Sequence, residues 1–366
     1  MARAALLLAI VGAGAGCGRQ RARVAKVADA GPVAVVVDAS APARGFVTGT
    51  VVVAARHDGH VRPLRLDPAT GRWQALGSGA DHLFPTEVAD GDAVLVIATR
   101  GEHDGEHVEQ LAWVRGAMVA PFGPRAASIR NPTRAGAAIV FESSARSFRD
   151  VYRLDAAAAA AEPARLTDDS AGNFEPALAP AGAAVVFTSS RDGDAELYRI
   201  PSRGGRATRL TASARDDWGA RWSPDGQRLV FLSDREGAPR AFVMAADGTD
   251  LRRLTAETDP AAVEDAPRWS PDGATLALLR GTPGAGAVVL ADARGPGPDP
   301  RPRVLTPVDA RDTEATWSPD GGYLLVARHQ PPTAAGAVTF VRIADNVAMA
   351  AEPADPRDPL ALRWYR

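Results

Sequence analysis

The 366-residue sequence lacks the features of several common protein classes. It contains one cysteine, so no disulfide can form within the chain and its stability must come from packing. No apolar run reaches the roughly 18–20 residues that span a bilayer, and no transmembrane helix is expected. The 42 Lys and Arg residues are balanced by 44 Asp and Glu residues. A nucleic-acid binder is therefore not expected, because no excess of basic charge offsets the phosphates.

Several catalytic motifs are missing as well. The sequence has no Gly-x-Ser-x-Gly nucleophile elbow and no Walker loop, and its single cysteine lies near the N-terminus. The one Gly-rich run that resembles a dinucleotide loop, residues 12–16, also lies near the N-terminus. These absences predict that the chain is not an enzyme and uses no cofactor.

The N-terminus resembles an export signal that ends in a lipidation site. A positive start at Met1-Ala-Arg3, an apolar run over 4–11 and five small residues lead to Cys17. This order is typical of a signal peptide, and a Cys directly after the small residues resembles a bacterial lipoprotein signal. We expect residues 1–16 to be removed and Cys17 to carry lipid, with an ordinary secretory signal as the alternative. Residues 17–44, with few large apolar side chains, are expected to form a flexible tether.

A repeat of about 46 residues runs through the rest of the chain. Ser-Pro-Asp-Gly occurs three times, each time directly after a Trp, at 222–226, 269–273 and 317–321. With weaker upstream copies, the repeat glycines are Gly91, Gly136, Gly182, Gly226, Gly273 and Gly321. Their spacings of 45, 46, 44, 47 and 48 residues predict a propeller or a solenoid.

Each period contains the pattern of four short strands. Ser-Pro-Asp-Gly is typical of a type I turn, because Pro fixes φ at the second position. An apolar run such as Leu229-Val-Phe-Leu232 follows and predicts a strand buried on both faces. A polar Ser-x-Arg-x-Gly loop, a third strand and an outer strand ending in Leu-Thr complete the period. Four strands per period predict an all-β fold, a β-propeller with one four-stranded blade per repeat.

The blade count rests on the spacing of the tryptophans. Trp364 comes 47 residues after Trp317 and is therefore in phase to supply the inner strand that the first blade lacks. We expect residues 362–365 to pair with residues 51–54, so that one blade contains both ends of the propeller. The propeller domain is placed at 45–366 and is expected to have seven blades, with six blades and an irregular hairpin as the alternative.

The repeat unit resembles the WD-like propeller repeats of the periplasmic TolB family. The string Trp-Ser-Pro-Asp-Gly, a buried strand, Ser-x-Arg-x-Gly, another strand and Leu-Thr carry this resemblance, which is sharp over 173–326 and weak over 45–167. Tricorn-type and prolyl-oligopeptidase-type peptidases contain the same repeat. TolB proteins carry a globular domain ahead of the propeller and the peptidases carry a hydrolase domain, and we expect neither here.

The resemblance implies an exported scaffold that binds a protein or peptide partner over the mouth of the propeller channel. We expect this scaffold to be monomeric and non-catalytic. Its lipid is expected to hold it on the periplasmic side of a bacterial membrane, the outer membrane being the first choice. Without the lipid it would be a soluble periplasmic or secreted protein.

Charged residues are expected to surround the channel mouth. Acidic residues recur just before the inner strands, and the binding candidates are Asp81, Asp169, Asp217, Asp265 and Asp312. Arg191 and Arg235 in the polar loops are expected near them. The same side chains could instead hold one blade to the next through ion pairs. The tryptophans are expected to pack between blades: Trp222, Trp269, Trp317 and Trp364.

The histidines support an alternative function. His103 and His107 lie among acidic residues, and imidazole together with carboxylate can hold a divalent ion. With His57, His60 and His329 they are expected to share one face. The alternative is therefore a metal-dependent carbohydrate-active enzyme, and a third hypothesis is a sensor or inhibitory subunit of a larger complex. The simplest interpretation of residues 102–107 is a solvated polar loop.

Overall fold

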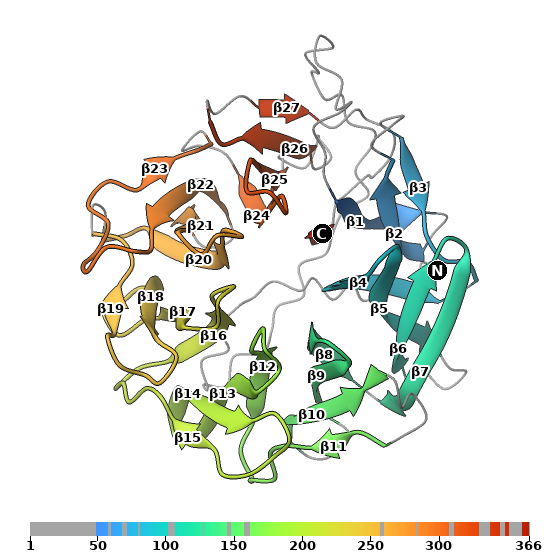
Figure 1. The fold of residues 1–366 in the computed structure, drawn as a ribbon, viewed down its shortest axis with the longest axis horizontal. Coiled ribbons are helices and arrows are strands. Elements are labelled where there is room, and N and C mark those ends of the chain that lie inside the picture. Colours follow the sequence, from blue (N-terminus) through green and yellow to red (C-terminus); the bar gives the residue numbers. More distant parts are fainter. Residues whose placement is uncertain are drawn as a thin grey trace, which may run out of the picture.

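The strands form a ring of sheets around a central axis (Figure 1). The computed structural model describes residues 49–365, except for 58–59, 68–71, 80, 102–106, 127, 145–147, 157–161, 257–259, 283–284, 307–310, 329–336, 345–347 and 351–360. The expected signal peptide, Cys17 and the tether lie outside the described residues. Within the described ranges, no helix has both the length and the apolar character needed to cross a bilayer.

The strands pair antiparallel in groups of four, and each group is one blade. The first blade contains β28 (Ala361–Tyr365), β1 (Thr50–His57), β2 (His60–Leu66) and β3 (Trp73–Ala75). The second contains β4 (His82–Asp90), β5 (Ala93–Gly101), β6 (His107–Arg115) and β7 (Met118–Ala126). The third contains β8 (Ile129–Ala135), β9 (Ala138–Ser143), β10 (Asp150–Asp155) and β11 (Ala164–Arg165).

The strands of the next four blades follow in the same order. The fourth blade contains β12 (Asn173–Leu178), β13 (Ala184–Asp192), β14 (Asp194–Pro201) and β15 (Thr208–Arg209), and the fifth contains β16 (Asp217–Trp222), β17 (Arg228–Ser233), β18 (Arg240–Ala245) and β19 (Arg252–Arg253). The sixth contains β20 (Val263–Trp269), β21 (Thr275–Thr282), β22 (Ala285–Asp292) and β23 (Arg303–Val304). The last contains β24 (Asp312–Trp317), β25 (Tyr323–Arg328), β26 (Ala337–Arg342) and β27 (Ala348–Ala350). The last two blades are joined by one pair, Gly286 with Asp312. The expected all-β propeller fold is confirmed.

Each blade buries both of its faces, and this explains the continuous apolar runs. Side chains alternate between the two faces of a sheet along a strand. In β1, Val51 and Val53 join the core shared with the last blade, whereas Val52 joins the core shared with the second blade. Among the described residues, seven apolar clusters each lie between two neighbouring blades. A middle strand with a core on each face must be apolar at successive positions, as in β17.

The repeat turns join the first and second strands of a blade on one face of the ring. In each turn the Gly N–H donates to the Ser carbonyl, at 2.8 Å for Gly226, 2.8 Å for Gly273 and 2.9 Å for Gly321. The φ angles of these glycines, 71°, 67° and 74°, are readily adopted by Gly and rarely by other residues. A Cβ at Gly273 would lie 3.5 Å from Cδ of Pro224 in the preceding turn, so successive turns touch on the same face.

Both ends of the described chain belong to the first blade. β28 pairs with β1 in the register Val51 with Trp364 and Val53 with Leu362. The C-terminal strand is thus the innermost strand of a blade whose other strands come from the start of the propeller, and Figure 1 shows the C-terminus beside the axis. This pairing covers an edge of β1 that would otherwise be open.

Removing the C-terminal strand should open the ring. A chain that ends at Pro359 loses the partner of β1 and uncovers part of the core around Val51 and Val53, which are both fully buried. Exposing each valine costs on the order of 1.5–3 kcal/mol, against a typical total stability of about 5–15 kcal/mol. We expect a sharp fall in Tm or loss of folding, measured by circular dichroism. A chain lacking only Arg366 is the control, and equal melting of the two truncated chains would contradict ring closure.

Candidate functional site

The tryptophan before each repeat turn connects its blade to the preceding one. Each indole N–H donates to a backbone carbonyl on the inner strand of the preceding blade. The pairs are Trp222 with Ala177 (2.9 Å), Trp269 with Arg221 (3.2 Å) and Trp317 with Arg268 (3.0 Å). These indoles act between blades, whereas the side chain of Trp364 lies outside the described part of the structure.

The arginine of the polar loop joins three strands of its own blade. In the fifth blade, the Arg235 guanidinium lies 4.7 Å from the ring centre of Phe242. It donates to the two carboxylate oxygens of Asp217 at 2.9 and 2.7 Å, and its Nε donates to the Ser233 hydroxyl at 2.8 Å. Asp217 is fully buried, so the ion pair supplies the charge that its carboxylate needs inside the protein.

The fourth blade repeats this arrangement with altered partners. Arg191 lies 4.3 Å from the ring centre of Tyr198 and donates to the Asn173 side-chain oxygen at 3.0 Å. Asn173 occupies the position of Asp217, and Asp169 supplies the carboxylate instead, at 2.7 Å from Arg191. The loop arginine and its aromatic neighbour are therefore common to both blades, whereas the acidic partner comes from a different position.

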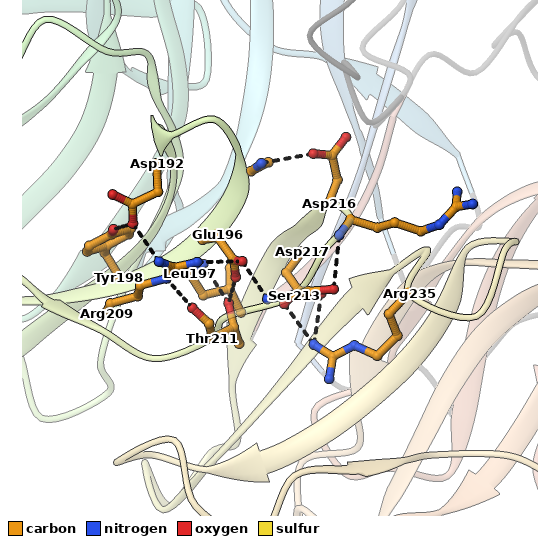
Figure 2. Close-up of polar contacts among 12 residues, drawn as sticks. Asp192, Glu196, Leu197, Tyr198, Arg209, Thr211, Ser213, Asp216, Asp217 and Arg235 are labelled. Carbon is orange, nitrogen blue, oxygen red and sulfur yellow. Dashed lines mark hydrogen bonds and ion pairs between the residues drawn. The ribbon is translucent and has the colours of Figure 1, made fainter.

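A threonine at the end of the outer strand fixes a buried carboxylate, as Figure 2 shows for the fourth blade. The Thr211 hydroxyl donates to Glu196 at 2.5 Å and accepts the Leu197 N–H at 2.9 Å. The Arg209 guanidinium donates to the other carboxylate oxygen at 2.8 Å, and the Ser213 N–H donates to it at 2.5 Å. Burial raises the pKa of Glu196, and these donors work against that shift.

We call this arrangement of threonine and carboxylate the threonine latch. It recurs in other blades with the partners Thr167 and Asp150, Thr255 and Glu264, and Thr306 and Asp312. Glu264 and Asp312 belong to the inner strand of the next blade, so these two latches bind neighbouring blades together. The Leu-Thr ending of the repeat is explained by this role.

Two acidic residues expected at the channel mouth are buried instead. Asp217 and Asp312 have no exposed surface and pair with Arg235 of the polar loop and with Arg328 at the end of β25. Their carboxylates are used to hold strands and blades, so the expectation that they face a partner is wrong. Asp169 is partly exposed within its ion pair with Arg191, and Asp81 is half-buried, with its backbone carbonyl accepting a hydrogen bond from Arg62.

Removal of one latch hydroxyl should destabilise the propeller. Thr211→Val leaves the Leu197 N–H and one oxygen of the buried Glu196 without their partner. We expect a loss of about 1–3 kcal/mol in the free energy of unfolding, measured by urea denaturation. Thr208→Val, on the exposed outer strand β15, is the matched control and should change stability by less than about 0.5 kcal/mol. Equal losses in the two variants would show that the hydroxyl plays no such role.

Tyr198 is held in its neutral form beside the same latch. Its phenol donates to Asp192, which also pairs with Arg209 at 2.9 Å. Burial, and then the hydrogen bond to Asp192 and its charge, raise the pKa of Tyr198 from 10.0 to about 12. The folded chain therefore holds the phenolic proton more tightly than the unfolded chain does. The resulting stability is fully present below pH 10 and is lost as the pH rises through about 12.

Tyr198→Phe should remove this part of the pH dependence. The difference in unfolding free energy between the two proteins should be constant below pH 10 and should shrink between pH 10 and about 12. Urea denaturation at several pH values, with ultraviolet absorbance of tyrosinate in the folded chain, measures it. A difference that stays constant over the whole range would contradict a proton held by Asp192.

The inner strands contain residues with unusual backbone geometry near the axis. The residues with positive φ are Asn131 on β8 (48°), Glu175 on β12 (50°), Gly219 on β16 (68°) and Ala266 on β20 (48°). Each one lies at a break in the pairing register with the second strand of its blade. Such bulges re-aim side chains, and backbone strain of this kind often marks functional sites.

A group of charged side chains gathers at these bulges; we call it the axial cluster. It consists of Glu175 on β12, Arg221 on β16, and Asp265 and Arg268 on β20. Burial raises the pKa of Glu175, Arg221 lowers it, and Asp265 raises it although Asp265 belongs to a strand two blades away. The backbone of Gly219 also hydrogen-bonds Glu175 and lowers its pKa.

The axial cluster contains carboxylates and an arginine that are partly buried. Burial also raises the pKa of Asp265, which accepts a hydrogen bond from the Ala266 N–H at 2.6 Å. The Nε of Arg221 is buried and has no hydrogen-bond partner within the described structure. Buried polar groups are normally paired, and this Nε is one of the exceptions in the described part of the chain.

Sequence reasoning found only part of this cluster. Asp265 was among the candidates, because acidic residues recur before the inner strands. Glu175 and Arg221 were missed, because they lie beyond the acidic positions and inside predicted strands. A usable signal was Pro176 and its counterpart Pro267, since Pro inside a strand marks an edge or a bulge.

Most of the histidines that would form a metal site lie outside the described part of the structure. His103 and His329 are not described, and neither are the side chains of His57 and His107. His60 lies 5.3 Å from His82 between ring centres, and His82 Nδ1 accepts the Val61 N–H at 3.0 Å. Within the described part of the chain, no three His, Cys, Asp or Glu side chains gather as a metal site.

Comparison with known proteins agrees with the blade architecture. The family model for the TolB beta propeller domain matches residues 165–297. TolB from Acinetobacter baumannii superposes with a TM-score of 0.53 and 20% identity, over 88% of this chain and 67% of that chain. The resemblance to the TolB family is therefore confirmed over residues 165–297, and the chain as a whole resembles TolB in its β-propeller fold. Among curated proteins, no sequence matches this chain.

Other similar structures are enzymes. A puromycin-hydrolyzing peptidase from Mycobacterium tuberculosis gives a TM-score of 0.60 at 20% identity, over 77% of this chain and 47% of that chain. Oligogalacturonate lyase from Vibrio parahaemolyticus gives 0.57 at 11% identity, over 84% and 86%. At these identities the likeness shows the fold alone. The expectation that the chain is not an enzyme is contradicted, because propellers of this shape occur in enzymes.

Proposed function

We propose that this TolB-like propeller binds a protein or peptide partner at the axial cluster. The cluster lies on the inner strands β12, β16 and β20, at the bulges beside the axis. Loops on a rigid scaffold commonly form binding surfaces. The resemblance to the TolB family supports this choice of ligand class.

The gathering of Glu175, Arg221, Asp265 and Arg268 from three blades is the observation that carries the proposal. A carboxylate from a partner would accept a hydrogen bond from the guanidinium of Arg221, which is partly exposed, and would compensate part of its charge. Asp265, whose carboxylate is partly buried, would in turn accept a donor from the partner's backbone or from a basic side chain. The cluster therefore fits a polar peptide segment that offers both a carboxylate and donor groups.

The proposal includes export and lipid anchoring through Cys17. A lipid on the Cys17 thiol would place the propeller on the periplasmic side of a bacterial membrane, where a TolB-like partner surface would face envelope proteins. Mass spectrometry of the mature N-terminus tests this part by itself. An unmodified N-terminus after residue 17 would remove the anchor and would leave the binding proposal intact.

Substitution at the axial cluster should abolish binding and preserve the fold. We propose Arg221→Gln and Asp265→Asn as baits for capture from native membranes, compared with the unaltered chain. Loss of one charge-assisted hydrogen bond should weaken binding by at least about tenfold. Arg206→Gln, at an exposed position remote from the cluster in sequence, is the matched control.

The readout is the set of captured proteins together with the Tm of each bait. A partner retained by the unaltered chain and by Arg206→Gln, and lost by both cluster variants at unchanged Tm, supports the proposal. Identical sets of captured proteins on all four baits would overturn it.

A further inference from the structure

Two arginines of the fifth blade converge on one backbone carbonyl. Arg228, the first residue of β17, donates to the Ala293 carbonyl at 2.5 Å and to the Gly273 carbonyl at 2.6 Å. Arg252, the first residue of β19, donates to the same Ala293 carbonyl at 2.6 Å and to the Gly297 carbonyl at 3.2 Å. Two fixed positive charges are therefore held side by side by neutral oxygens.

This pair has no ion-pair partner in the described part of the chain. The acidic side chain whose charge acts on Arg252 is Asp292, but its carboxylate accepts hydrogen bonds from the Arg294 N–H at 2.8 Å and Nε at 3.3 Å. Burial and the neighbouring Arg228 lower the pKa of Arg252. Like charges this close repel each other, and the charges of Asp225 and Asp292 offset this repulsion only from outside ion-pair distance.

The two guanidiniums keep donors for a ligand. A guanidinium has five N–H groups, and the carbonyl contacts use two from each arginine. Arg228 is also held from the side, because its guanidinium lies 4.8 Å from the ring centre of Trp269. Both side chains are half-buried and positioned before any ligand arrives, which reduces the entropy that binding would cost.

The pair is a departure from the repeat. The position of Arg228, at the start of the second strand, is occupied by Ala184, Thr275 and Tyr323 in nearby blades. The position of Arg252, at the start of the outer strand, is occupied by Thr208 and Arg303 in the two adjacent blades. Neither adjacent blade has arginine at both positions, so the fold itself does not require the pair.

We propose that Arg228 and Arg252 form a binding site for an oxyanion of the phosphate class. A phosphate group between the two guanidiniums would accept hydrogen bonds from both and would neutralise their charge. Arg228 contacts the Gly273 carbonyl of a repeat turn, so the site lies on the turn face. Its two arginines are not part of the axial cluster, so the two sites can be altered and tested separately.

Inorganic phosphate is the first probe. At low ionic strength, with sodium chloride matched, we expect saturable heat in isothermal titration calorimetry and a rise in Tm with phosphate concentration. Arg228→Gln and Arg252→Gln should each weaken binding by at least about tenfold. Arg206→Gln, an exposed arginine of the preceding blade, should bind like the unaltered chain.

The Tm in phosphate-free buffer distinguishes a ligand site from a purely structural role of the two arginines. Without phosphate, Arg252→Gln should melt no lower than the unaltered chain, because the substitution relieves repulsion and Gln can still donate a hydrogen bond. A large fall in Tm in phosphate-free buffer would show that the arginines are structural and would overturn the proposal. Absence of phosphate binding by the unaltered chain, or binding by both variants as tight as that of the unaltered chain, would overturn it as well.

Vesicles distinguish the source of the phosphate. Binding to phosphatidylglycerol vesicles over phosphatidylcholine vesicles, lost in the double variant and competed by inorganic phosphate, would assign the site to a lipid headgroup. Binding of inorganic phosphate without vesicle binding would assign it to a soluble phosphate ester. The axial-cluster variants should bind phosphate normally, so failure of the partner proposal would leave this result unaffected.

Discussion

Burial of both faces of every blade is the constraint on which the structure depends. Each sheet shares one apolar core with the blade before it and another with the blade after it, as Val52 and its neighbours Val51 and Val53 show in β1. An open arc of blades would expose a complete sheet face at each end. The chain avoids this by placing β28 beside β1, so that the first and last blades share a core as any other neighbours do.

The same constraint explains where the polar side chains lie. Middle strands have no face in contact with solvent. A charged side chain must therefore lie at a strand end or be neutralised by a buried partner. The threonine latch satisfies this need at the outer strand, where Thr211 and Arg209 surround the carboxylate of Glu196. The loop arginine satisfies it at the inner strand, where Arg235 covers Asp217. The acidic, Thr and Arg side chains that recur in the repeat therefore serve mainly to neutralise buried charge within and between blades.

Much of the fold was predictable because its causes are local and repeated. A turn sequence, an apolar run and a Leu-Thr ending recur in phase, and the spacing of Trp364 indicated the strand that pairs with β1. The site was less predictable. Whether an Asp before an inner strand faces solvent or a buried arginine depends on packing between blades, which periodicity does not encode, and Asp217 was misplaced for that reason. Glu175 could be predicted as a site residue only with knowledge of the bulge at which it lies.

Function in a repeat fold is best sought where one blade departs from the others. Positions that follow the repeat, such as the turn glycines and the latch threonines, are explained by closure of the ring. Glu175 and Asp265 belong to strands two blades apart, and the charge of Asp265 nevertheless raises the pKa of Glu175. Arg228 and Arg252 depart by adding two charges where an adjacent blade has Ala184 and Thr208. The carbonyl contacts of Arg228 and Arg252 reach the next blade and use part of their donors. In the described part of the chain their charge has no carboxylate within ion-pair distance, and a bound anion is the physical reason that we propose for retaining it.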